Sequence, residues 1–295
     1  MKHVQVQLGQ PERRVCRVLE QARSTQRYVR VPRDGDQALV RRLHELVRAH
    51  PRRGYRMMWG MLRLDGWRVN CKRVHRLWKQ EGFKVPRKQH KKRRLGHSAN
   101  GVLRLRAQYK GHVWAVDFIH DWDERGRPLK WLSIVDEFTR ECVRLEVERG
   151  ITSEDVVSLL IEAFNVRGVP THIRSDNGGE FIAAVITRLA EITGMEMLYI
   201  KPGSPWENGY AESFHSRLRD ELLNAEVFDG LADAKALAAK WRHEYNHRRP
   251  HSSLGYLPPA MYAASLAGPA VGAAPLPPAR PAASPVDPTL EPQLS

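Results

Sequence analysis

Three acidic residues occupy positions at which a carboxylate could bind a metal ion. Asp117 interrupts the apolar run "VWAVDFI", and a buried carboxylate is costly unless it is paired or binds a metal ion. Asp176 closes the strand-like segment "THIRSD" and is followed by Asn-Gly-Gly, which lets the backbone turn sharply. Glu212 lies on the polar face of an amphipathic helix expected over 204–223. Two strand carboxylates and one helix carboxylate can therefore converge at one edge of a sheet.

An oxygen-only ligand set of this kind suits Mg²⁺ or Mn²⁺, which also accept substrate phosphate oxygens. Two such ions roughly 3.5–4 Å apart would activate a nucleophile on one side of a phosphodiester and stabilise the leaving oxygen on the other. We therefore expect Asp117, Asp176 and Glu212 to be both catalytic residues and metal ligands. A cysteine-rich zinc site is excluded, because the three cysteines are scattered and lack CxxC spacing.

The helix expected over 204–223 has two faces at helical spacing. The face expected toward the core carries Tyr210, Phe214, Leu218 and Leu222. The other face adds three candidates to Glu212: Asn208 and His215 as possible support for the active site, and Arg219 as a DNA contact. Arg219 nearly eclipses Glu212, because seven residues at 100° each leave an offset of only about 20°. A polar helix face is usually just solvated, so this interpretation depends on the partners elsewhere in the chain.

The elements that must position these residues can be read from the periodicity. Three strand-like runs follow one another from residue 112, and then helices and strands alternate, which indicates a mixed α/β sheet covered on both faces. We expect strands within 112–122, 129–139, 142–149, 171–176 and 195–200, and helices over 153–167, 180–193, 204–223 and 231–247.

Residues 36–83 are predicted to form a small helix-turn-helix domain of three helices. The third helix starts after Asn70 as N-cap, and its outer face is basic. A plain helical bundle with a basic surface stays open as the alternative. The following segment, 84–110, is a basic linker suited to tracking phosphates. The candidate DNA-binding residues are Lys72, Arg73, Arg76 and Lys79 on the helix and Lys91, Lys92, Arg93 and Arg94 in the linker.

The charge distribution also indicates a nucleic-acid partner. Residues 1–110 hold 30 Lys and Arg against 7 Asp and Glu, whereas the remainder holds 18 against 26. No run of 18 or more apolar residues and no secretory h-region occur, so we expect a cytoplasmic protein associated with the nucleoid. The expected organisation is a basic N-terminal segment (1–35), the helix-turn-helix-like domain (36–83), the linker (84–110), the catalytic core (111–262) and a disordered Ala/Pro-rich tail (263–295).

These motifs resemble a known family. The patterns "WAVDF", "SDNGGEF" and "SPWENGYAESFHSRLRDELL", with 35 residues between Asp176 and Glu212, are similar to the DDE integrase core. The chain resembles more closely the second-frame, OrfB-type transposases of bacterial insertion sequences, over residues 12–262. The stretches "RGYRMMWGMLRLDGWRVNCKRVHRLWKQEGFKVPRK", "DEFTRECV" and "YNHRRPHSSLGYLPPAMY" carry the same resemblance.

The resemblance implies a ribonuclease H-like fold with a five-stranded sheet, and Asp117, Asp176 and Glu212 as ligands of Mg²⁺ or Mn²⁺ in a two-ion site. It also implies that Arg219 contacts the DNA terminus. The implied partners are double-stranded DNA at element ends and target, a first-frame (OrfA-type) protein or fusion, and further copies of the chain on DNA. His243 and His247 formally match HExxH, but the family's "YNxxRPHSSL" pattern accounts for them without a metal.

The leading interpretation is therefore a transposase that cuts and rejoins DNA ends by metal-dependent attack on phosphodiesters. Two alternatives stay open: a ribonuclease H-like nuclease without strand transfer, and a DNA-binding protein with a decayed catalytic core. The helix-turn-helix and the basic linker favour the transposase over a simple nuclease, and the intact acid triad counts against decay.

Overall fold

The structure is a computed structural model that describes residues 2–28, 36–85, 105–200 and 208–266. Lys91, Lys92, Arg93 and Arg94 lie outside the described residues, as does most of the tail expected over 263–295.

A five-stranded sheet in the order β3-β2-β1-β4-β5 forms the centre of the molecule. The first three strands form an antiparallel meander, and β4 and β5 run parallel to β1. This is the mixed sheet of the ribonuclease H-like fold, and the fold prediction is confirmed. The bounds are β1 (Val113–Trp122), β2 (Pro128–Asp136), β3 (Cys142–Glu148), β4 (His172–Ser175) and β5 (Glu196–Tyr199).

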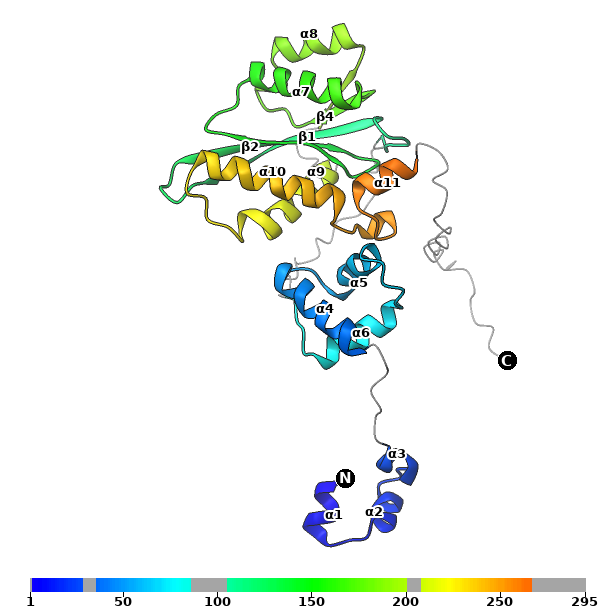
Figure 1. Cartoon of the computed structure of the whole chain (residues 1–295). Coiled ribbons are helices and arrows are strands. Elements are labelled where there is room, and N and C mark those ends of the chain that lie inside the picture. Colours follow the sequence, from blue (N-terminus) through cyan, green and yellow to red (C-terminus); the bar gives the residue numbers. More distant parts are fainter. Residues whose placement is uncertain (1, 29–35, 86–104, 201–207, 267–295) are drawn as a thin grey trace, which may run out of the picture.

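Helices cover both faces of the sheet (Figure 1). α7 (Ser153–Arg167) and α8 (Ala184–Thr193) pack on one face, where Trp114 and Val116 of β1 lie in their core. α9 (Gly209–Leu218) and α10 (Leu231–His247) pack on the other face, where Ile119 lies in the core. Because successive side chains of a strand point to opposite faces, Asp117 is on the Ile119 side and is directed at α9. The alternation of side chains along β1 therefore places Asp117 on the face covered by α9 and α10.

The three-helix unit forms as the sequence predicts. α4 (Asp36–Ala49), α5 (Tyr55–Leu64) and α6 (Cys71–Gln80) enclose their own apolar core. The side chain of Asn70 accepts a hydrogen bond of 2.8 Å from the backbone N–H of Lys72, which is the expected N-cap. Three short helices precede this unit in the segment 1–35, to which the sequence analysis assigned none: α1 (Lys2–Leu8), α2 (Glu12–Val18) and α3 (Arg23–Arg27). A short α11 (Pro259–Ser265) spans the predicted boundary at residue 262, so the first residues of the expected disordered tail are helical.

The three-helix unit packs directly against the catalytic core (Figure 1). Trp59 of α5 meets Tyr256 edge to face, with ring centroids 5.4 Å apart. A Cβ built on Gly60 would lie 2.7 Å from the Cβ of Pro250, so only glycine allows this approach without a shift. The segment "RPHSSLGY" (249–256) is therefore the surface of the core on which α5 rests.

Two helix predictions are wrong in their bounds. The helix expected from Glu180 begins at Ala184, because residues 177–183 form a series of turns after the Asn-Gly-Gly. The helix expected to run to residue 223 ends as an α-helix at Leu218 and continues as a π-helical turn, η2 (Arg219–Leu223). The wider turn lets both Leu222 and Leu223 be buried. No helix among the described residues is long and apolar enough to cross a membrane.

Candidate active site

Asp117 is the least exposed member of the predicted triad and is partly buried. Its Oδ1 accepts a hydrogen bond of 2.8 Å from the backbone N–H of Phe118, and its Oδ2 accepts one of 2.7 Å from Nδ2 of Asn208. Burial raises the pKa of Asp117 to about 6, and the charges of Asp176 and Glu212 push it in the same direction. The carboxylate is thus held by two donors but lacks a compensating charge. A bound cation would supply that charge.

Asp176 lies just past the carboxyl end of β4. Ala115 of β1 pairs with Arg174 of β4, so the same register continued by two residues sets Asp176 at the level of Asp117. The backbone N–H of Gly178 donates to Oδ1 of Asp176 at 3.0 Å, and a Cβ on Gly178 would lie 3.0 Å from that oxygen. The Asn-Gly-Gly turn therefore wraps closely around the second carboxylate, and Asp176 itself is exposed.

Glu212 is exposed on α9, one turn after Asn208. Its charge acts on Asp117, as the raised pKa of that residue records. In the described part of the chain, no three His, Cys, Asp or Glu side chains are gathered tightly enough to hold a metal ion. The residue types fit a hard divalent cation, because all three are carboxylates and Asp117 is short of positive charge. The two exposed acids would have to close on Asp117 to complete such a site.

His215 and Asn208, the two residues expected to support the active site, lie beside Asp117. Nδ1 of His215 is 3.7 Å from Oδ2 of Asp117, and its Nε2 is 2.8 Å from the hydroxyl of Ser133. Burial lowers the pKa of His215 to about 4, and the charge of Arg219 adds to this effect. The imidazole is therefore neutral at pH 7. The Oδ1 of Asn208 is buried without a hydrogen-bond partner among the described residues.

Ser133 is a residue that the sequence analysis missed. It lies directly opposite Asp117 in the antiparallel register of β1 and β2, so both side chains point toward α9. The signal was present, since Ser133 is a lone polar residue within the apolar run "WLSIV". Its strand partner, however, could not be known before the register was fixed.

Arg219 is exposed at the C-cap of α9, where the π-helical turn begins. Its charge lowers the pKa of His215, which places the guanidinium near the site. The role of Arg219 as a DNA contact stays a prediction. Of the four residues expected to face the core, Phe214, Leu218 and Leu222 are buried. Tyr210 is only half-buried and lies beneath the guanidinium of Arg140.

Glu180 does not open a helix but pairs with Lys130 of β2. This ion pair lowers the pKa of Glu180, and the ammonium group of Lys130 also lies 4.2 Å from the ring centroid of Phe118. Glu180 is thus engaged by a neighbouring strand, although its carboxylate also lies beside the turn that wraps Asp176.

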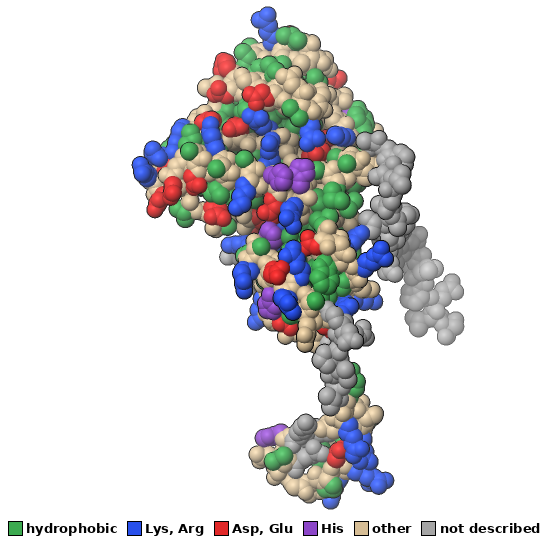
Figure 2. Space-filling model, in the orientation of Figure 1, with side chains coloured by type: hydrophobic (Ala, Val, Ile, Leu, Met, Phe, Trp, Pro, Cys, Tyr) green, Lys and Arg blue, Asp and Glu red, His purple; other side chains and the backbone are tan. Residues whose placement is uncertain are grey.

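The basic face of α6 is only partly available to DNA. Arg73 and Arg76 form ion pairs of 2.7 and 2.8 Å with Asp36 at the start of α4. Lys72 and Lys79 are exposed. On the face shown in Figure 2, Lys and Arg side chains are spread over the molecule and mixed with acidic ones. The two lysines therefore keep the character expected of a phosphate contact, while the two arginines stabilise the helical unit.

Comparisons with known proteins agree with this architecture. Two models described as "Integrase core domain" match residues 107–205 and 193–259, and one described as "HTH-like domain" matches residues 34–92.

Several relatives come from bacterial insertion elements. The chain is 40% identical over 254 residues to a 39.2 kDa protein of insertion element IS476 from Xanthomonas euvesicatoria, covering 86% of this chain and 72% of that protein. It is 36% identical over 269 residues to a 31.7 kDa protein of insertion element IS407 from Burkholderia multivorans, covering 90% and 94%. It is 30% identical over 241 residues to the transposase InsD of IS2 elements from Escherichia coli, covering 77% and 78%.

A solved structure with a similar fold is the simian T-cell lymphotropic virus intasome in complex with the PP2A regulatory subunit B56 gamma. The match has a TM-score of 0.49 and 17% identity, and covers 76% of each chain.

Proposed function

The chain belongs to the insertion-element transposases that carry an integrase core domain, and we propose that Asp117, Asp176 and Glu212 are its metal-binding catalytic residues. It is a polynucleotidyl transferase of the DDE class, which cleaves and joins DNA strands. The observation that carries the assignment is the partly buried Asp117, whose pKa is raised by burial and by the charges of the other two acids. Metal-ligand carboxylates produce this mutual repulsion when no cation is present.

The three carboxylates would hold Mg²⁺ or Mn²⁺, with two ions as the expected number. Such ions activate the attacking oxygen of water or of a 3′-hydroxyl and stabilise the leaving oxygen of the phosphodiester. Attack by water cleaves an element end, and attack by the freed 3′-hydroxyl joins that end to target DNA.

Asn208 and His215 support the acid rather than react. The amide of Asn208 orients Asp117 by donating to Oδ2, which leaves Oδ1 of the carboxylate facing the Phe118 N–H. The low pKa of His215 keeps the imidazole neutral, so that it does not repel a cation beside Asp117. Ser133 fixes the ring from the neighbouring strand. Exposed Arg219 is free of this network and is suited to a phosphate of the DNA end.

The proposed partners are double-stranded DNA at the element ends and at the target, a first-frame (OrfA-type) protein or fusion, and further copies of this chain on DNA. The HTH-like match and the basic first third of the chain support the DNA partner. We propose a location in the bacterial cytoplasm, on the nucleoid. Co-purification of the chain with the product of an overlapping upstream frame would test the first-frame partner.

The triad is tested by metal binding and by strand joining. Mn²⁺ should raise the melting temperature of the wild-type chain, and Asp117→Asn, Asp176→Asn and Glu212→Gln should each remove most of this increase. Joining of a pre-cleaved element end should fall at least about 10³-fold in each variant, because a ligand of the activating ions is lost. Asp121→Asn is the matched control, since Asp121 lies on the same strand and is excluded from the triad. Full joining activity in any triad variant would overturn the assignment.

A further inference from the structure

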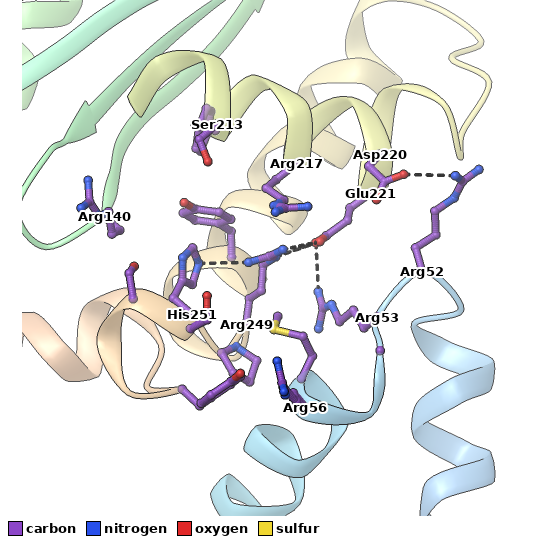
Figure 3. A pocket seen from close by; sticks show the side chains of 18 of the residues that line it. Arg52, Arg53, Arg56, Arg140, Ser213, Arg217, Asp220, Glu221, Arg249 and His251 are labelled. Atoms are coloured by element: carbon purple, nitrogen blue, oxygen red, sulfur yellow. Dashed lines mark hydrogen bonds and ion pairs between the residues drawn. The ribbon is translucent and has the colours of Figure 1, made fainter. Parts of the chain in front are cut away.

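A polar cleft is lined by Tyr210, Ser213 and Arg217 of α9 and by none of the proposed catalytic acids. It is a cleft of about 720 Å³ between the three-helix unit and the core. Its walls come from the α4–α5 corner, from α9 and η2, from the β2–β3 turn and from the segment 249–256 (Figure 3). Six of its lining residues are arginines: Arg52, Arg53, Arg56, Arg140, Arg217 and Arg249.

Three of these arginines are already neutralised. Arg53 and Arg249 both bind Glu221, at 3.4 and 2.6 Å, and Arg52 binds Asp220 at 3.1 Å. The pairs of Arg52 and Arg53 join the three-helix unit to the core across the cleft, whereas the Arg249–Glu221 pair lies within the core (Figure 3).

The other three arginines form no carboxylate ion pair within 4 Å among the described residues, although the charge of Arg217 acts on Glu221. The guanidinium of Arg140 lies 3.8 Å from the ring centroid of Tyr210, and that of Arg56 lies 5.6 Å from the ring of Tyr55. Arg217 belongs to α9 and lines the cleft (Figure 3). A guanidinium stacked on an aromatic ring, as that of Arg140 is, can still donate N–H groups to an anion. Arg56 hydrogen-bonds to the side chain of Tyr55 and is exposed to solvent. The cleft therefore holds three cations that its own acids do not balance.

Arg140 has a backbone conformation that favours glycine. Its φ is +65°, in the left-handed region, at the end of the tight turn between β2 and β3. A non-glycine residue there costs of order 1–2 kcal/mol, and such strain persists where the side chain has a use. The Nη1 atom of Arg140 is also buried without a hydrogen-bond partner among the described residues. The unpartnered Nη1 leaves the Arg140 side chain able to donate a hydrogen bond to a ligand in the cleft.

The positive field inside the cleft acts on a buried neighbour. Burial, followed by the charges of Arg249, Arg140 and Arg217, holds the pKa of His251 well below its ordinary value. The imidazole is therefore neutral and adds no further positive charge to the cleft.

We propose that this cleft binds the phosphodiester backbone of DNA through Arg56, Arg140 and Arg217, a role that rests on the proposed function. Planar guanidinium groups match phosphate oxygens bidentately, whereas the acids that could repel a phosphate are paired with arginines already. Arg217 follows Glu212 by five residues, or about 140° around α9. A strand in the cleft would therefore lie roughly 10 Å from the catalytic acids, across the width of one helix.

This placement would let one DNA molecule contact both parts of the chain. Arg56 comes from α5 of the HTH-like unit, and Arg140 and Arg217 come from the integrase core. A backbone held between them fixes the orientation of the DNA relative to the acids without reading its sequence.

The test measures DNA binding by the full-length chain in EDTA, so that metal and catalysis play no part. The probes are a fluorescein-labelled 30-base-pair duplex of arbitrary sequence and one of its strands alone, each at two salt concentrations. Arg56→Ala, Arg217→Ala and Arg140→Gly should each weaken binding about tenfold and reduce the salt slope by about one, since one phosphate contact is lost. Losses with both probes indicate a single-strand backbone as the ligand, and losses with the duplex alone indicate duplex DNA.

Two controls separate binding from folding. Arg63→Ala removes an arginine of the same helix that also stacks on an aromatic ring, Trp59 at 4.9 Å, but lies outside the cleft. It should leave the affinity within about twofold. Arg140→Gly should keep or raise the melting temperature, because glycine relieves the strained turn, while still losing DNA affinity.

Wild-type affinity and salt slope in all three cleft variants would overturn the proposal. So would a loss of affinity in Arg140→Gly that only follows a loss of stability. The outcome is independent of the catalytic assignment: Asp117→Asn should bind DNA as wild type does in EDTA, and its strand-joining result decides the triad alone.

Discussion

The charged carboxylate of Asp117 lowers the stability of the metal-free fold. Its unfolded pKa is near 4 and its folded pKa is about 6, so the charged carboxylate is penalised in the folded state. The penalty is absent below about pH 4, grows as pH rises to about 6 and is constant above that. Active-site carboxylates commonly carry such a cost, because the same repulsion provides affinity for a cation.

Asp117→Asn should therefore stabilise the metal-free chain while abolishing strand joining. The expected gain in unfolding free energy at pH 7 is on the order of 1–3 kcal/mol, since two pKa units correspond to about 2.7 kcal/mol and residual exposure reduces that value. The gain should vanish at pH 4, and thermal unfolding of both proteins in EDTA between pH 4 and 8 measures it. A variant less stable than wild type at pH 7 would show that Asp117 is a structural acid.

Helix α5 carries a residue of low helix propensity where the helix contacts the core. Gly60 occupies the interior of this helix, where glycine costs up to about 1 kcal/mol relative to alanine. The structural reason is the contact with Pro250, since a Cβ on Gly60 would lie 2.7 Å from the Cβ of that proline. The helix therefore gives up intrinsic stability to allow the three-helix unit to approach the core.

A glycine-to-alanine change inside a helix usually stabilises a protein, but Gly60→Ala should destabilise this one. We expect destabilisation by about 1–3 kcal/mol, because overpacking at Pro250 outweighs the gain in helix propensity. Urea unfolding of the full chain measures the change. Gly60→Ala combined with Pro250→Gly should recover part of the loss, because glycine lacks the Cβ that the new side chain would meet. A stabilised single variant would mean that α5 does not rest on Pro250.

At the scale of the whole molecule, a buried ion network joins the HTH-like unit to the core. Glu221 of η2 binds Arg249 and Arg53, and Arg53 also binds Glu244 of α10 at 2.6 Å. Burial alone would raise the pKa of Glu221, but the hydrogen bonds and charge of Arg249, with the charge of Arg53, hold it below its usual value. The network therefore stabilises the fold above pH 4–5 and weakens as pH falls through the lowered pKa.

Glu221→Gln should loosen the two parts of the chain, because two buried guanidinium groups lose their shared anion. We expect a loss of about 3 kcal/mol in unfolding free energy at pH 7, measured in urea, with faster hydrogen exchange in α5. Arg52→Ala is the matched control from the same interface. Its pair with Asp220 is solvent-exposed, so the change should stay below about 1 kcal/mol. Equal effects of the two substitutions would contradict a buried network.

The sequence by itself determined the order of the elements and the identity of the acids, because periodicity, caps and turn residues are local signals. The bounds of α5 and α10 and the Asn70 cap could be predicted for that reason. Only the tertiary structure decided what depends on register and on packing between distant segments. The pairing of Ser133 with Asp117 needs the strand register, and the ties of Arg73 and Arg76 to Asp36 need the packing of α6 on α4. The cleft joins residues from 52 to 256, and no local pattern records that they meet.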